Sequence, residues 1–272
     1  MASCGSPTPT APVTSATGSP SASASETTTA AAAASASEAP SSAAQAAPMD
    51  PQLQAAAAGG PAAGAPFRTL PVQHSLDDPA SPWVVVNKRR PITPAQFVPG
   101  DLVRPAVPLA VSGEAALLNR TTAAAAERLF AAASAAGAPM ALASGYRSYA
   151  TQTATYNSYA ATRGTESADT ASARPGYSEH QTGWAFDIAD AGGACSFEPC
   201  FADQPAAVWV REHAHEFGFV VRYPWMLHET TGYFYEPWHL RYVGVEAATD
   251  MRARGIATLE EYFGTGVAPG YL

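Results

Sequence analysis

Hydrophobic and polar residues divide the chain near residue 66. Residues 1–66 are mostly Ala, Ser, Thr, Pro and Gly, and they contain no aromatic residue, Lys or Arg. Such a segment buries too little apolar surface to offset the entropy lost on ordering, so we expect a disordered linker. Residues 67–272 contain every aromatic residue of the chain, and their length suits one folded domain.

Within residues 67–272, the pattern of apolar positions predicts a succession of strands and helices. Short apolar runs bounded by turn residues predict strands over 83–86, 140–144, 184–188 and 219–222, with a final strand or turn over 233–239. Apolar residues at helical spacing predict helices over 113–136, 149–163, 205–217, 245–254 and 259–263. Helices packed on a small, mainly antiparallel sheet make an α+β fold, which is the fold class that we expect.

Single residues mark where these elements begin, end or give way to loops. Ser112 and Ser148 are candidate helix N-caps, and Gly137 and Gly218 are expected to end helices. Residues 165–176 are polar and are expected to lack regular structure. Because they run directly into a candidate site, we expect them to form a mobile lip over its cleft.

Two short stretches, 178–187 and 236–239, contain the residue types of a catalytic zinc site. A lone His is more often a hydrogen-bonded structural residue, and a lone Asp is more often a cap or a solvated loop residue. Three ligands together would leave one position of the metal open for water, and a spare carboxylate could act as a base. The candidate zinc ligands are His180, Asp187 and His239, and the candidate base is Glu236.

The spacing of these residues constrains the backbone between them. His180 and Asp187 are seven residues apart, so on one unbroken strand they would point to opposite faces. They can converge only if the chain bends, and Gly183 is the residue that permits a bend. Glu236 precedes Pro237 and is therefore biased towards an extended backbone. The second stretch is thus unlike the helical H-E-x-x-H motif of the zincins.

The two stretches also resemble a known family. S-x-H-x-x-G-x-A-x-D followed by E-P-W-H is similar to the VanY-type D-alanyl-D-alanine carboxypeptidases, part of the zinc peptidase group that includes lysostaphin-type enzymes and the hedgehog domain. The likeness covers residues 83–244 and includes the stretches 85–88, 144–148 and 218–224. It implies that the first His, the Asp and the last His bind Zn²⁺ in a cleft on the sheet, and that the Glu is the catalytic base.

A substrate-binding residue follows from the same resemblance. Arg147 lies in a stretch that matches the family's Y-R-S sequence, in which the Arg contacts substrate. An isolated Arg is more often a surface residue, but a guanidinium offers two parallel N–H groups to a carboxylate. We therefore expect Arg147 to hold the terminal carboxylate of a peptide. Further candidates for substrate hydrogen bonds are Gln152, Ser178 and Tyr177.

The function that the resemblance implies is a zinc-dependent D,D-carboxypeptidase. It would remove the terminal D-alanine from peptidoglycan stem peptides. The alternatives on the same metal site are an L,D-carboxypeptidase, a D,D-dipeptidase or a peptidoglycan endopeptidase. A non-catalytic cell-wall binding module is a further alternative, but a binding module need not keep a base, so the intact Glu236 favours an enzyme.

Three cysteines bear on where the protein works. Cys195 and Cys200 lie in an insert over 192–204 and are expected to form a disulfide, which suits an oxidising compartment outside the cytoplasm. The alternative is a second metal site, for which two thiols alone are a poor ligand set. Cys4 follows small residues as in the end of a bacterial lipobox, without the hydrophobic part. If the true start lies upstream, we expect Cys4 to carry a lipid anchor at the outer face of the membrane. The alternative for Cys4 is a chance cysteine near the start codon.

Charge and hydropathy argue against a nucleic-acid partner and against a membrane-spanning helix. The formal net charge is −8, and the predicted domain contains one lysine, Lys88. Such an acidic chain is a poor candidate for binding nucleic acid. No apolar stretch reaches the length of about 18 residues that a membrane-spanning helix needs, and no signal peptide is visible. We expect a monomer in the cell envelope whose membrane contact is limited to a lipid at Cys4.

Overall fold

The computed structural model describes residue 70 and residues 73–272. Every described residue belongs to one compact unit of the chain. The expected N-terminal linker and the expected lipidation of Cys4 lie outside the described residues and stay predictions.

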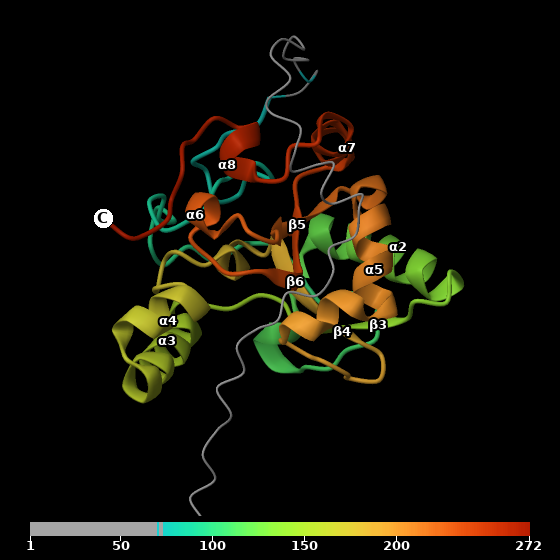
Figure 1. The fold of residues 1–272 in the computed structure, drawn as a ribbon, viewed down its shortest axis with the longest axis horizontal. Coiled ribbons are helices and arrows are strands. Elements are labelled where there is room, and N and C mark those ends of the chain that lie inside the picture. Colours follow the sequence, from blue (N-terminus) through green and yellow to red (C-terminus); the bar gives the residue numbers. More distant parts are fainter. Residues whose placement is uncertain (1–69, 71–72) are drawn as a thin grey trace, which may run out of the picture. The chain divides into compact units, whose positions relative to one another are not determined.

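A four-stranded antiparallel sheet in the order β3-β4-β6-β5 forms the framework of the described domain (Figure 1). Its strands are β3 (Met140–Ser144), β4 (Ala185–Asp190), β5 (Phe219–Tyr223) and β6 (Glu236–Tyr242). A smaller sheet pairs β1 (Leu102–Val103) with β2 (Leu118–Asn119). Small antiparallel sheets combined with helices confirm the expected α+β class.

Helices surround this sheet and belong to two kinds. The α-helices are α2 (Arg120–Ala135), α3 (Tyr149–Arg163), α4 (Thr165–Ala171), α5 (Pro205–His213), α6 (His228–Thr231), α7 (Val245–Arg254) and α8 (Leu259–Tyr262). The 3₁₀ helices are η1 (Gly113–Ala116), η2 (Glu179–Thr182), η3 (Pro199–Asp203) and η4 (Ala214–Phe217). Helices α2 and α5 contact the sheet, whereas α3 and α4 lie side by side as a separate pair (Figure 1). In the described part of the chain, no helix has both the length and the apolar character needed to cross a membrane.

Apolar side chains between the sheet and its helices form the main core. Leu129 of α2 and Val210 of α5 pack with Phe186 of β4 and with Leu240 of β6, and all four are fully buried. Burying one such side chain stabilises the fold by roughly 1.5–3 kcal/mol. The core therefore fixes how β4 and β6 face α2 and α5, and it leaves the opposite sides of these strands for other side chains.

The first predicted helix begins later than expected. Helix η1 and strand β2 occupy the start of the predicted range, and α2 begins at Arg120. Ser112 makes no side-chain cap hydrogen bond. The side-chain oxygen of Asn119 instead accepts hydrogen bonds from the backbone N–H groups of Thr121 and Thr122 at 2.9 and 3.3 Å. Asn is among the strongest N-caps, so the helix starts behind it.

Residues 83–86 are buried but form no strand, so that prediction was wrong. The guanidinium of Arg241 donates to the carbonyl oxygens of Pro82 and Val84 at 2.9 and 2.8 Å. Buried carbonyl groups need hydrogen-bond donors, which a neighbouring strand usually supplies. Here an arginine side chain supplies them, and the apolar run is buried without joining the sheet.

Helix α4 replaces the structureless segment that was expected over 165–176. Ala168 of α4 is fully buried, and Asp169 accepts a hydrogen bond from the Tyr156 hydroxyl of α3 at 2.7 Å. Arg174, which follows α4, pairs with the same carboxylate at 2.8 Å. These contacts with α3 and with the following residues stabilise a short helix that has little apolar pattern of its own.

Candidate metal centre

Three elements bring the predicted ligands together. His180 lies on η2, Asp187 on β4 and His239 on β6, and the register of these two strands places Asp187 directly opposite His239. Gly183 ends η2 with a φ of +70° and lets the chain turn into β4. A Cβ atom at this position would also lie 2.9 Å from the backbone nitrogen of Asn119. The bend predicted at Gly183 is therefore present, and a side chain there would be strained.

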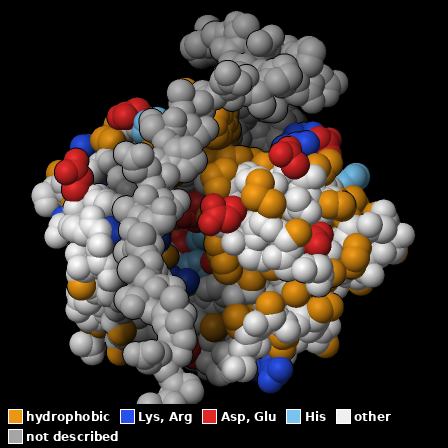
Figure 2. Space-filling view, turned by 60° about the horizontal axis from the view of Figure 1, so that its bottom comes forward, with side chains coloured by type: hydrophobic (Ala, Val, Ile, Leu, Met, Phe, Trp, Pro, Cys, Tyr) orange, Lys and Arg blue, Asp and Glu red, His pale blue; other side chains and the backbone are white. Residues whose placement is uncertain are grey.

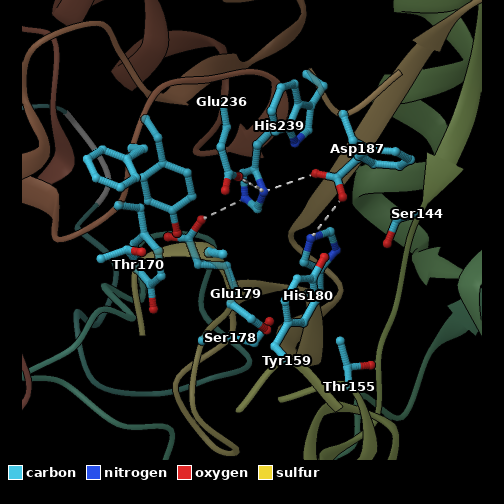
Figure 3. A pocket seen from close by; sticks show the side chains of 18 of the residues that line it. Ser144, Thr155, Tyr159, Thr170, Ser178, Glu179, His180, Asp187, Glu236 and His239 are labelled. Atoms are coloured by element: carbon cyan, nitrogen blue, oxygen red, sulfur yellow. Dashed lines mark ion pairs between the residues drawn. The ribbon is translucent and has the colours of Figure 1, made fainter. Parts of the chain in front are cut away.

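The three side chains form a tight, buried cluster. Their potential ligand atoms all lie within 4.8 Å of one another. The Nε2 atom of His180 is 3.3 Å from Asp187 Oδ2, and the Nδ1 atom of His239 is 3.1 Å from Asp187 Oδ1. Figure 3 shows both imidazoles directed at the carboxylate between them.

The donor set fits zinc. The Nδ1 atom of His180 donates to the carbonyl oxygen of Gly145 at 2.8 Å, which leaves Nε2 as the free nitrogen on the side of Asp187. Asp187 Oδ1 is buried and makes no hydrogen bond within the described residues, although His239 Nδ1 is close to it. Two imidazole nitrogens and one carboxylate oxygen are the ligands of many catalytic zinc sites. His180 through Nε2, His239 through Nδ1 and Asp187 could thus hold the ion.

Burial and neighbouring charges shift the pKa values of the cluster in different directions. Burial favours the neutral form of Asp187, but the two histidines hold its pKa well below its usual range. Burial lowers the pKa of His180. Burial also lowers that of His239, but the carboxylates of Asp187 and Glu179 outweigh it and raise this pKa to about 9. Asp187 thus stays ionised, and nearby carboxylates favour the protonated, positively charged form of His239. The same negative charge will also attract a metal cation.

Glu236 lies beside the cluster without belonging to it. Its Oε2 atom is 3.6 Å from His239 Nδ1, and only 19% of its side chain is exposed. This burial raises the pKa of Glu236 to about 7. A carboxylate with a pKa near neutrality can both accept and return a proton under ordinary conditions, which is the requirement for a general base.

A cavity of about 580 Å³ opens over the cluster and Glu236. In the space-filling view, histidine and acidic side chains lie in a hollow that hydrophobic side chains border on one side (Figure 2). Of the predicted substrate contacts, Arg147 and Ser178 line this cavity. Gln152 and Tyr177 are not among the lining residues: Gln152 is fully buried, and Tyr177 packs edge-on against Tyr271 at 5.1 Å between ring centroids.

The guanidinium of Arg147 is held in place by neighbouring side chains. It donates to Gln152 Oε1 at 3.1 Å and to Ser144 Oγ at 3.0 Å. The amide nitrogen of Gln152 in turn donates to Ser172 Oγ at 3.1 Å and to the carbonyl oxygen of Ala173 at 2.6 Å. Gln152 therefore acts on the cavity through Arg147, whose orientation is set before any ligand enters.

A disulfide joins Cys195 and Cys200. The loop that it closes places Phe197 against Trp238, with ring centroids 6.0 Å apart. Both rings line the cavity, on the side that also contains Pro199. The insert thus contributes an apolar wall to the site.

Sequence reasoning missed one acidic residue of the site, Glu179. It is fully buried next to His239, and its Oε1 atom accepts from Arg222 at 2.8 Å and from Arg241 at 3.0 Å. The sequence did indicate a buried acidic residue, because each of the two arginines lies inside a short apolar strand. A buried guanidinium needs a carboxylate partner. Nothing in the sequence indicated that the partner would be the neighbour of His180.

Comparisons with known proteins identify the family of this chain. The family model "VanY: D-alanyl-D-alanine carboxypeptidase" matches residues 115–245. The putative carboxypeptidase YodJ of Bacillus subtilis strain 168 is 36% identical over 191 residues, which cover 70% of this chain and 69% of that protein. The chain belongs to the VanY family. The resemblance of its two motifs to this family is confirmed.

Solved structures of VanY-like proteins share the fold. The LdcB LD-carboxypeptidase superposes with a TM-score of 0.65 at 37% identity, covering 68% of this chain and 87% of that one. A Zn(II) complex of the vancomycin resistance D,D-pentapeptidase VanY superposes with a TM-score of 0.56 at 33% identity, covering 66% of this chain and 97% of that one. This VanY-family member is accordingly a zinc-dependent carboxypeptidase.

We predict that zinc binding tightens as the pH rises towards 9. In the metal-free protein His239 holds a proton with a pKa of about 9, and zinc must displace that proton to bind the imidazole. Below this pKa the apparent affinity should therefore increase by about tenfold per pH unit. Chelator-competition titrations between about pH 6 and pH 8 would measure the slope.

The His239→Ala protein is the control for this titration. It should bind zinc weakly throughout the range because one ligand is missing. A wild-type affinity that does not change with pH would contradict the assignment of His239 as a ligand.

Proposed function

We propose that this enzyme removes the terminal D-alanine from peptidoglycan stem peptides, with His180, Asp187 and His239 as its zinc ligands. The observation that carries the proposal is a preoriented guanidinium, that of Arg147, in the same cavity as the buried His/Asp/His cluster. An enzyme that cleaves only the last peptide bond must recognise a free carboxylate next to that bond. This arrangement supports a substrate whose terminal carboxylate binds Arg147 while its last peptide bond lies at the His/Asp/His cluster.

Each residue of the cavity has a distinct part in the proposed reaction. When bound, zinc would polarise the scissile carbonyl and increase the acidity of water beside it. Glu236 accepts a proton from the attacking water and passes it to the leaving amine, for which a pKa of about 7 is suited. Arg147 binds the terminal carboxylate through two parallel N–H groups and so aligns the last bond with Glu236.

A second candidate is an L,D-carboxypeptidase that uses the same residues. The specific observation in its favour is the LdcB LD-carboxypeptidase, which superposes with a higher TM-score and a higher identity than the VanY zinc complex. Both candidates need the zinc cluster, Glu236 and Arg147, and they differ in the configuration of the residue before the scissile bond. Defined pentapeptide and tetrapeptide muropeptides, analysed by mass spectrometry, separate them. Loss of D-alanine from the pentapeptide alone supports the D,D-carboxypeptidase.

The proposed substrate places the enzyme outside the cytoplasm. Peptidoglycan lies in the cell envelope, and the disulfide between Cys195 and Cys200 is compatible with an oxidising compartment. A lipid on Cys4 would tether the enzyme near its substrate, and the linker that follows would give it reach. Mass analysis of the protein exported by its host tests this part of the proposal, and an unmodified Cys4 would contradict it.

Glu236→Gln should lose most of its turnover and keep its zinc. The amide has nearly the size of the carboxylate but cannot accept a proton, and a general base typically contributes roughly 10²- to 10⁴-fold to the rate. The measurements are kcat on a defined pentapeptide and metal content by elemental analysis. Glu229→Gln, at a side chain that is 81% exposed on α6, is the control and should leave both values unchanged. Near-normal turnover of Glu236→Gln would contradict the assigned role.

Arg147→Ala should weaken cleavage only of peptides that have a free terminal carboxylate. Removing one partner of a charge-assisted pair costs roughly 2–5 kcal/mol, or on the order of 30-fold to several thousand-fold in kcat/KM. Amidation of the peptide terminus should cause a similar loss in the wild type and little further loss in Arg147→Ala.

Arg163→Ala provides the matched control for this comparison, because Arg163 is a second cation that lines the same cavity. It should retain the full preference for the free acid over the amide. If the wild type cleaves both peptides equally well, the enzyme is an endopeptidase, and Arg147 does not bind a terminal carboxylate.

A further inference from the structure

Glu179 lies immediately behind His239, on the side away from Asp187 (Figure 3). Its side chain is fully buried, and its Oε2 atom is 3.4 Å from His239 Nε2. Neither atom makes a hydrogen bond within the described part of the chain, and both are shielded from solvent. A buried imidazole nitrogen and a buried carboxylate oxygen without other partners are strongly favoured to share a proton with each other.

The other oxygen of Glu179 is fixed by two arginines. Oε1 accepts from Arg222 Nε at 2.8 Å and from an Arg241 terminal nitrogen at 3.0 Å. Arg222 also makes two hydrogen bonds to Glu260 at 2.7 and 2.9 Å, and Asn87 donates to the same carboxylate at 2.9 Å. Two buried cations thus face two buried carboxylates. This network determines where Glu179 Oε2 points.

We infer that Glu179 is a positioning residue for the metal site. Its Oε2 atom accepts the Nε2–H of His239, which keeps that proton on Nε2 and makes Nδ1 the nitrogen that faces Asp187 and the cavity. The inference rests on the proposed role of His239 as a zinc ligand. A carboxylate that accepts from the outer nitrogen of a metal-binding imidazole fixes its tautomer and orientation, and its loss typically weakens metal affinity by roughly 10- to 100-fold.

The backbone performs the corresponding task for the other histidine. The carbonyl oxygen of Gly145 accepts the Nδ1–H of His180 and directs Nε2 to the cavity. The two imidazoles therefore face the site through opposite ring nitrogens, and each needs its own acceptor on the far side. For His239, Glu179 is the acceptor.

A pair of substitutions separates positioning from the neutralisation of the arginines. Glu179→Gln and Glu260→Gln each remove one negative charge from the same buried network, but only Glu179 faces His239. In Glu179→Gln the arginines should retain the amide oxygen, so the amide nitrogen turns towards His239 Nε2. It can only donate there, so it would favour the tautomer with the proton on Nδ1, and zinc would have to displace that proton to bind.

The measurements are the zinc dissociation constant, by competition with a chelator, and the Tm of the metal-free proteins. We expect both substitutions to lower the Tm to a similar degree. We expect only Glu179→Gln to weaken zinc binding, by about 10- to 100-fold. Equal losses of zinc affinity in the two variants, or no loss in Glu179→Gln, would overturn the inference.

A measurement on the wild type keeps the inference testable if Glu179→Gln fails to fold. In the zinc-loaded protein labelled with ¹⁵N-histidine, NMR should show His239 protonated at Nε2 and bound to metal at Nδ1, and the opposite assignment would overturn the inference. The His239→Ala protein separates this proposal from the ligand set itself. If His239→Ala retains zinc, the proposed ligands are wrong, whereas if it loses zinc and Glu179→Gln retains it, only the positioning role fails.

Discussion

The antiparallel pairing of β4 with β6 is the constraint on which the site depends. Asp187 lies opposite His239, and the adjacent pair, Phe186 and Leu240, points to the other face of the sheet. Both apolar side chains are fully buried in the main core. Because side chains alternate along a strand, a slip of one residue would turn the core pair towards the cavity and the ligand pair towards the core. Hydrophobic burial on one face thus sets the position of the proposed metal ligands on the other.

Charge compensation is the second requirement of this arrangement. Removing an ion from water costs several kcal/mol even after relaxation of the protein, so a buried carboxylate needs partners on every side. Glu179 has Arg222, Arg241 and His239 as partners, whereas Asp187 has only the two histidines within the described residues. The negative charge of Asp187 is therefore the less compensated of the two. A dication placed between Asp187 and the histidines would complete the balance.

Much of the site could be predicted from the sequence, and the physical reason differs from residue to residue. His180 and His239 could be proposed as ligands because their stretches resemble the two VanY motifs, and the bend at Gly183 could be predicted because only a bend lets His180 and Asp187 converge. The position of Glu179 in the site could not be predicted because its partners come from strands that are distant in sequence. The same holds for residues 83–86, where the side chains of Arg241 and Arg90, and not a neighbouring strand, donate to the carbonyl groups of Val84 and Val85. Motifs and local pattern thus identified the candidate ligands and most elements, but not the contacts made by long polar side chains.

The central claim is that two imidazoles and one carboxylate hold the catalytic zinc. X-ray absorption spectroscopy at the zinc edge tests it most directly, because this measurement reports the ligand types of the bound metal without reference to activity. The account predicts two imidazole nitrogens at about 2.0–2.1 Å, further oxygen ligands and no sulfur. It also predicts the loss of one imidazole signal, or of the metal, in His239→Ala. A sulfur ligand, or a spectrum that His239→Ala leaves unchanged, would contradict the account.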